Sequence, residues 1–191
     1  ADAQPVLRLG QIHDRLDGGR PGRRSPMSAA AKGTITRDDV IDFIYAEARM
    51  LDEGRFSEWL DLWLPDGCYW MPLDYKQTDP DMVTSLLYED NFMLRLRVER
   101  LNGERTFSQK PKSRCHHVIQ RPFVDVFDAD AGTFQASTNM HYVETRLDEQ
   151  QLLALTATHD LKQVDGQLRI ANKKVELLNS DAAFGNIQLL P

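Results

Sequence analysis

Residues 36–72 read TRDDVIDFIYAEARMLDEGRFSEWLDLWLPDGCYWMP and decide the fold that we expect. Thr36 is a favourable helix N-cap, and Asp39 stands three residues later, in the position of a capping-box acid. Apolar residues then recur at helical spacing up to Gly54, a residue type that commonly follows a helix. We therefore predict a helix over 36–54 with one apolar face, made of Val40, Ile41, Ile44, Ala48 and Leu51.

The second half of this stretch predicts a short helix and then a strand. Residues 56–64 have a helical pattern, which the turn residues 65–67 end. Residues 68–72 are rich in side chains that favour strands, and Pro72 marks the end of the strand or a sheet edge. We interpret the aromatic cluster as core or subunit interface rather than as a substrate cage: Trp59, Trp63, Tyr69 and Trp70.

Two carboxylates accompany the apolar face of the first predicted helix. At about 100° per residue, Glu47 lies on one border of that face and Asp52 on the other. Acids are seldom buried without a partner. We therefore expect either that both are border residues in contact with water or with an arginine, or that one or both lie near a partly buried space where the helix packs on a sheet.

Further along the chain the pattern changes from helical to strand-like. Residues 81–87 fit a loop or a short helix, and a clearer helix follows over 89–101. From residue 113 onward, apolar and polar residues alternate, with Asp165-Gly166 as a hairpin signal and Pro122 as a break in the first strand. The four strands that we expect are 113–127, 133–146, 151–164 and 168–178.

Helices followed by long meandering strands indicate an α+β fold. We expect a cone in which a curved, mainly antiparallel sheet wraps around the N-terminal helices and leaves a pocket between them. Residues 34–191 should form this domain. Residues 1–33 are rich in Gly, Arg and Pro and cannot build a core, so we expect an extended arm that subunit contacts order.

Composition excludes several classes of protein. The chain has 191 residues, 41% of them hydrophobic, which suits one domain with a sizeable core. Its net charge of −6 argues against binding to nucleic acid. No apolar run approaches the ~20 residues of a membrane span, and no apolar segment resembles a signal peptide. Two cysteines without a CxxC pair favour a reduced, cytoplasmic setting.

The sequence also lacks motifs for redox and nucleotide chemistry. A Rieske cluster needs two Cys and two His in paired short motifs, and Cys115-His116-His117 has no second half elsewhere in the chain. There is no HExxH, GxGxxG or GxxxxGKS/T motif. In a regular strand His116 and His117 point to opposite faces, so we expect no iron site from them.

Short matches to a known family run in order along residues 36–180. They are Glu47-Ala48, Leu51-Asp52, Trp59, Asp66, Tyr69, Pro72, Tyr88-Glu89-Asp90, Leu94, Arg97-Val98-Glu99-Arg100-Leu101, Pro111, Ser113-Arg114, Leu168-Arg169-Ile170-Ala171, Lys173-Lys174-Val175 and Leu177-Leu178. In this order and spacing, the chain resembles the small (β) subunit of aromatic-ring-hydroxylating dioxygenases, which share the NTF2-like cone fold. It departs from the family at Ala157-Thr158-His159-Asp160, where Gly-x-Arg-x-Asp is usual, and at Lys173-Lys174, where Arg is common.

The resemblance implies a structural subunit that carries no cofactor and no catalytic residue of its own. In such a complex, which is an oxidoreductase of aromatic breakdown, the catalytic α subunit would carry a Rieske [2Fe-2S] cluster and a mononuclear non-haem Fe(II). The family's typical assembly is an α3β3 hexamer, to which a reductase and sometimes a ferredoxin deliver electrons. The aromatic substrate would be chosen in the α subunit.

Eight residues are candidates for subunit contacts or structural roles under this resemblance. They are Glu47, Asp52, Tyr88, Asp90, Arg97, Arg100, Ser113 and Arg114. Arg97 lies next to the apolar face of its predicted helix. We expect it either to be solvated or to pair with an acid of the first helix or of another chain.

Two other functions fit the same fold. A free-standing cone-fold dehydratase or isomerase would need a cavity set for general acid–base chemistry, for which Asp52, Tyr69 and His159, with Tyr45, are the candidates. A non-enzymatic ligand-binding or adaptor cone would need only the pocket. An open cavity lined by His and Asp would favour the enzyme.

Overall fold

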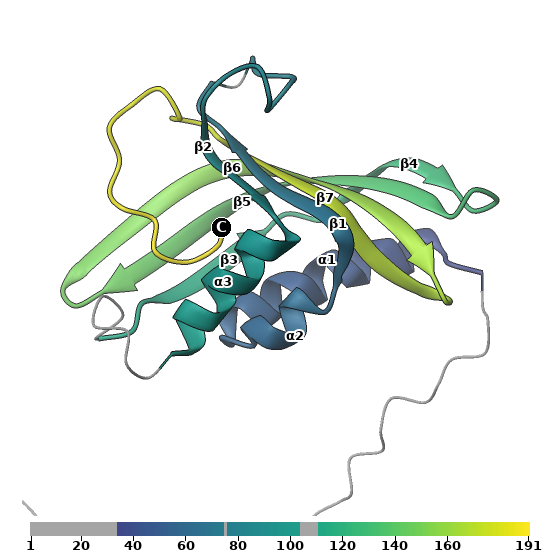
Figure 1. Ribbon diagram of the computed structural model, residues 1–191, viewed down its shortest axis with the longest axis horizontal. Coiled ribbons are helices and arrows are strands. Elements are labelled where there is room, and N and C mark those ends of the chain that lie inside the picture. Colours follow the sequence, from purple (N-terminus) through teal and green to yellow (C-terminus); the bar gives the residue numbers. More distant parts are fainter. Residues whose placement is uncertain (1–33, 75, 104–110) are drawn as a thin grey trace, which may run out of the picture. The chain divides into compact units, whose positions relative to one another are not determined.

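The computed structural model describes residues 34–74, 76–103 and 111–191 (Figure 1). The predicted arm over 1–33 lies outside these residues. The helices are α1 (Arg37–Asp52), α2 (Phe56–Leu60) and α3 (Asn91–Asn102). The strands are β1 (Trp63–Pro72), β2 (Ser85–Asp90), β3 (Arg114–Ile119), β4 (Phe123–Asp128), β5 (Thr133–Arg146), β6 (Glu149–Val164) and β7 (Gln167–Leu177).

The seven described strands form one sheet in the order β2-β1-β7-β6-β5-β3, and β4 pairs with β5 beside β3. Five of the six pairings among these strands are antiparallel, and only β1 with β7 is parallel. The sheet is curved, and the three helices lie along one of its faces (Figure 1). The expected mainly antiparallel sheet packed on N-terminal helices is therefore confirmed.

Strand alternation places the core between the sheet and the helices. In β6, every second residue is buried: Leu153, Leu155, Ala157, His159 and Leu161. We call this side the inner face. The apolar residues of α1 pack against it and bury a continuous cluster with the aromatic residues Trp59, Trp63 and Tyr69. Burial of this apolar surface is the main force that holds the sheet on the helices.

Local signals located most element boundaries correctly. Thr36 and Asp39 form the capping box at the start of α1, and Gly54 has a positive φ of 69° after its end. The first long strand is broken at Pro122 into β3 and β4, as expected. Asp165 and Gly166 both have positive φ between β6 and β7, which is the geometry of a tight hairpin turn.

Four predictions about the elements were wrong. The first strand starts at Trp63 instead of residue 68, so the expected turn residues 65–67 lie within it. The second helix ends at Leu60 instead of continuing to residue 64, because the chain joins β7 there: the amide of Ile170 donates to the Leu62 carbonyl at 2.8 Å. Residues 85–90, predicted as loop or helix start, form β2 against β1. The third helix consequently starts at Asn91, where the Asp90 side chain accepts from the Met93 amide.

No described helix is both long and apolar enough to cross a membrane.

Candidate functional site

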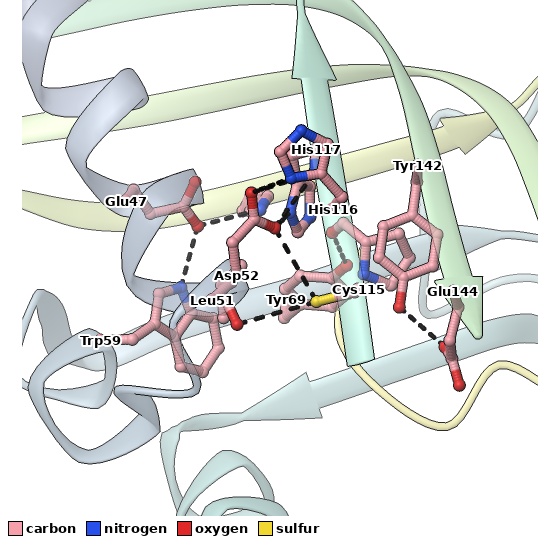
Figure 2. Close-up of polar contacts among 12 residues, drawn as sticks. Glu47, Leu51, Asp52, Trp59, Tyr69, Cys115, His116, His117, Tyr142 and Glu144 are labelled. Carbon is pink, nitrogen blue, oxygen red and sulfur yellow. Dashed lines mark hydrogen bonds and ion pairs between the residues drawn. The ribbon is translucent and has the colours of Figure 1, made fainter. Parts of the chain in front are cut away.

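A fully buried group of polar side chains joins two helices to the sheet (Figure 2). Glu47 of α1 accepts from the Trp59 indole of α2 at 2.9 Å and from the Lys173 ammonium of β7 at 2.9 Å. Its second oxygen lies 3.3 Å from Nε2 of His159 on β6. We call these four residues the Glu47 cluster. The expectation that Glu47 contacts water or an arginine was wrong, because its side chain is only 1% exposed and its partners are Trp59, His159 and Lys173.

Charge compensation makes this burial possible. Burial acts to raise the pKa of Glu47, but attraction by Lys173 and hydrogen bonds from His159 and Trp59 outweigh it and lower the pKa. Burial lowers the pKa of His159, against the attraction of Glu47. The cluster therefore holds one carboxylate, one ammonium and a neutral imidazole, with no net charge.

The Glu47 cluster should make stability fall in acid. The lowered pKa of His159 means that the unfolded chain, with an imidazole pKa of 6.5, binds a proton that the folded chain does not. Stability should therefore fall as pH drops below about 6.5. It should fall further below the ordinary Glu pKa of 4.5, because folded Glu47 stays ionised. Urea unfolding from pH 8 to pH 4 tests this, and His159→Gln should remove the upper part of the decline. An equal decline between pH 6.5 and 5 in the variant would contradict it.

A second polar contact ties the end of α1 to β3. The Asp52 carboxylate accepts from the His117 amide at 3.0 Å and lies 2.6 Å from Nδ1 of the same residue. Nδ1 of His116 lies 3.3 Å from the other Asp52 oxygen. The Cys115 thiol donates to the Leu51 carbonyl at 3.7 Å. Asp52 is thus an anchor that fixes the register between helix and strand.

The two histidines do lie on opposite sides of β3, as expected, since the His117 side chain is 1% exposed and that of His116 is 71% exposed. Both nevertheless reach Asp52. Donor atoms of Asp52, Cys115 and His117 lie within 4.8 Å of one another, a spacing in the range of a metal site. The short Asp52–His117 contact is a hydrogen bond, and burial and then the charge of Asp52 raise the pKa of Cys115 to about 12. Cys115 is therefore a thiol rather than the thiolate that binds a metal, and the contacts among the three groups are hydrogen bonds.

Neither cysteine environment fits a Rieske cluster. Cys68 lies on β1, opposite Asp90 of β2, whereas Cys115 lies on β3 against the end of α1. A Rieske cluster needs two thiolates at one centre, and burial raises the pKa of both thiols. The chain's described residues thus offer no place for this group.

Asp52→Asn should lower the free energy of unfolding by about 1–2 kcal/mol, because the hydrogen bonds to His117 would lose a charged acceptor. Chemical denaturation measures this directly. Asp42→Asn on the exposed side of α1 is the matched control and should change stability by less than about 0.5 kcal/mol. Equal effects of both substitutions would show that Asp52 is not an anchor.

The acid–base set of the alternative function does not assemble. Asp52 is bonded to His117, His159 to Glu47, and the Tyr69 hydroxyl donates to the main-chain oxygen of Pro191. Among the described residues, no hydrogen bond joins two of Asp52, Tyr69 and His159. Tyr45, the further candidate, is exposed. Sequence reasoning missed Lys173 and His117, whose inward orientation brings them to the two acids.

The other candidate residues have varied surroundings. Arg97 forms a double contact with Glu89 of β2, through Nε at 2.8 Å and through Nη2, so its partner within this chain is not an acid of the first helix. Asp90 caps α3. The Ser113 hydroxyl is buried without a hydrogen-bond partner among the described residues. Asp90 is exposed, and so are three further candidates: Tyr88, Arg100 and Arg114.

Comparison with known proteins relates most of the chain to one protein family. The family model described as "Ring hydroxylating beta subunit" matches residues 46–182. The 2-halobenzoate 1,2-dioxygenase small subunit of Burkholderia cepacia is 34% identical over 146 residues, which cover 74% of this chain and 87% of that protein. The family match spans the residues of the Glu47 cluster and of the Asp52 anchor.

Similarity to solved structures agrees with the family match. The beta subunit of benzoate 1,2-dioxygenase from Burkholderia mallei superposes with a TM-score of 0.66 at 25% identity, covering 83% of this chain and 99% of that one. An NTF2-like protein with a cystatin-like fold from Novosphingobium aromaticivorans has a TM-score of 0.54 at 13% identity, over 75% and 82% of the two chains. The second similarity concerns the fold alone.

Proposed function

Since the chain belongs to the family of ring-hydroxylating beta subunits, we propose that it is the structural small subunit of an aromatic-ring-hydroxylating dioxygenase. The observation that carries the proposal is the family match over 46–182. The interior supports it, because the polar side chains of the cone are bonded to one another and not arranged around a substrate. The dehydratase or isomerase alternative has no assembled acid–base set in its favour.

The catalytic partner in this proposal is an α subunit with a Rieske [2Fe-2S] cluster and a mononuclear non-haem iron. We propose an α3β3 hexamer in the cytoplasm, served by a reductase and, in some systems, a ferredoxin. Two free cysteines without a disulfide support a reduced compartment. Relatives are named for 2-halobenzoate and benzoate, so an aromatic carboxylate is the substrate class to test first.

Residues 1–33 have a role in this proposal as an assembly arm. Their composition, rich in Arg, Gly and Pro, supports contact with a neighbouring subunit, because such a segment gains order only from a surface outside itself. Arg100, Arg114 and Tyr88 are exposed and are the proposed contact residues within 34–191.

Co-expression with the α subunit tests the function. We expect native mass spectrometry to give equal numbers of the two chains, and iron and acid-labile sulfide to follow the α subunit. The isolated chain should hold no stoichiometric iron and oxidise no arene. A purified chain with about one tightly bound iron, or one that never associates with the α subunit, would contradict the proposal.

The same experiment with residues 34–191 alone tests the arm. This shortened chain should show near-native far-UV circular dichroism, and its hexamer should dissociate on dilution in analytical ultracentrifugation. Assembly as tight as that of the full chain would remove the arm from the proposal and leave the subunit function standing.

A further inference from the structure

After β7 the chain leaves the sheet and turns back toward the helices (Figure 1). Residues 187–191 form neither helix nor strand, yet Leu189, Leu190 and Pro191 are buried. We call residues 187–191 the inserted segment. Leu189 lines one hollow together with residues of α1, α3 and β3: Leu51, Leu101 and Cys115. The inserted segment thus lies where three elements of the cone meet.

Polar side chains of the inner face hold the backbone of the inserted segment. The amides of Gln188 and Leu189 both donate to the Glu144 carboxylate of β5, each at 3.2 Å. The Tyr69 hydroxyl of β1 donates to the Pro191 main-chain oxygen at 2.5 Å. Glu144 also accepts from the Tyr142 hydroxyl at 2.7 Å, as Figure 2 shows.

These contacts make the inserted segment and its surroundings complementary. Glu144 is buried, and a buried carboxylate is costly unless donors surround it. Two of its three described donors are amides of the inserted segment. Tyr69 is also buried and needs an acceptor for its hydroxyl. Leu189 and Leu190 supply the apolar surface that fills the remaining space.

The backbone of the inserted segment is bound by side chains, as in a peptide complex, and not by the backbone of a neighbouring strand, as in an extended sheet. Side chains that were already positioned by β1 and β5 bind two successive amides and one carbonyl. The connection from the sheet to the inserted segment is mostly exposed over residues 181–186. The segment can therefore be separated from the sheet by a cut in this connection without breaking a helix or strand.

We propose that the cone interior beside Tyr69 and Glu144 is a peptide-binding site, which this chain fills with its own residues 187–191. The ligand it takes is a short extended peptide with two successive amide donors, two adjacent leucine-type side chains and a following carbonyl. While the inserted segment is in place, it covers the Tyr142 and Glu144 side of the interior. The proposal stands on these contacts and does not depend on the proposed subunit function.

The test is to cut the chain and replace the segment. A site for a specific protease is inserted between Ala182 and Ala183, which are both exposed, and the folded protein is cut. The released fragment is washed out in mild denaturant. A dye-labelled peptide of residues 184–191 should then bind, as measured by fluorescence polarisation, and should restore the melting temperature of the uncut protein.

Three controls test whether the peptide binding is specific. Glu144→Gln should weaken peptide binding roughly tenfold or more, because two amide bonds lose a charged acceptor. Asp125→Asn, at an exposed acid of β4, should leave it unchanged. A peptide with Ser in place of Leu189 and Leu190 should not bind. A cut protein that stays folded and binds no labelled peptide, or binds the serine peptide equally well, would overturn the proposal.

A second measurement does not depend on the inserted protease site. In the intact chain, Glu144→Gln should speed hydrogen–deuterium exchange of the amides of Gln188 and Leu189 by about the same factor as the peptide affinity falls. Unchanged exchange in a folded Glu144→Gln protein would also overturn the proposal.

Discussion

Replacing Lys173 by Met should lower the free energy of unfolding of the domain by about 3–5 kcal/mol, since it leaves a buried carboxylate without its counter-charge. Lys173 and Glu47 are each only 1% exposed and lie 2.9 Å apart. Hydrogen bonds from Trp59 and His159 would remain, but neither residue carries a positive charge in the folded protein. Denaturant unfolding followed by tryptophan fluorescence measures the loss.

The neighbouring lysine is the matched control. Lys174 points to the other face, with its side chain 26% exposed, and pairs with Glu176. Lys174→Met should therefore cost no more than about 1 kcal/mol. The double variant Glu47→Met with Lys173→Met should recover part of the loss, because both buried charges are gone. If Lys173→Met is as mild as Lys174→Met, the Glu47 cluster does not hold the helices on the sheet.

Local sequence signals were sufficient for most of the fold. The capping box at Thr36, the break at Pro122 and the turn at Asp165-Gly166 are each decided by a few adjacent residues. Alternation from residue 113 onward gave the strands, because one face of each strand packs on the helices. The β1 to β7 pairing is different, since it joins residues about 100 positions apart and no local pattern encodes its parallel direction.

The Glu47 cluster was missed for two different reasons. At about 100° per residue, Glu47 lies about 20° outside Val40, at the border of the apolar stripe, so the helical spacing alone does not show its burial. Glu47 is buried because Trp59, His159 and Lys173 surround it from other elements. The position of Lys173 was not readable, because counting in twos from Val175 places Lys173 inside, whereas counting from Ile170 places Lys174 inside. An irregularity in the pairing of β6 with β7 decides between them.

The inserted segment shows a further limit of sequence reading. Its five residues have no helical or strand period, and the side chains that hold it are on strands far away in the sequence. Glu144 itself reads as an ordinary residue of an alternating strand. Only the folded sheet brings Tyr69 and Glu144 close enough to bind one short backbone stretch, so the site becomes visible only in three dimensions.

The second large loss of stability is expected when the Arg97–Glu89 pair, which joins α3 to β2, is broken. Arg97 binds Glu89 through two nitrogens, and their side chains are only 13% and 9% exposed. A bidentate arginine–carboxylate pair fixes orientation as well as charge. Arg97→Met should cost about 2–4 kcal/mol, because Glu89 would stay largely buried without a partner. Arg97→Lys should cost about 1–2 kcal/mol, since it keeps the charge but loses the second bond.

Measuring Arg97→Met in the isolated chain and in the assembled complex shows whether the Arg97–Glu89 pair stabilises the fold or the assembly. Arg95→Met is the control on the same helix. Arg95 is exposed, and its hydrogen-bond partner among the described residues is Asn91 at 3.0 Å, so the change should cost less than about 1 kcal/mol. The geometry places both partners of the Arg97 pair in one chain, so its loss should appear in the unfolding of the isolated chain. If Arg97→Met leaves that stability intact and weakens only the complex with the α subunit, then Arg97 turns outward on assembly. In that case its partner is an acid of another chain.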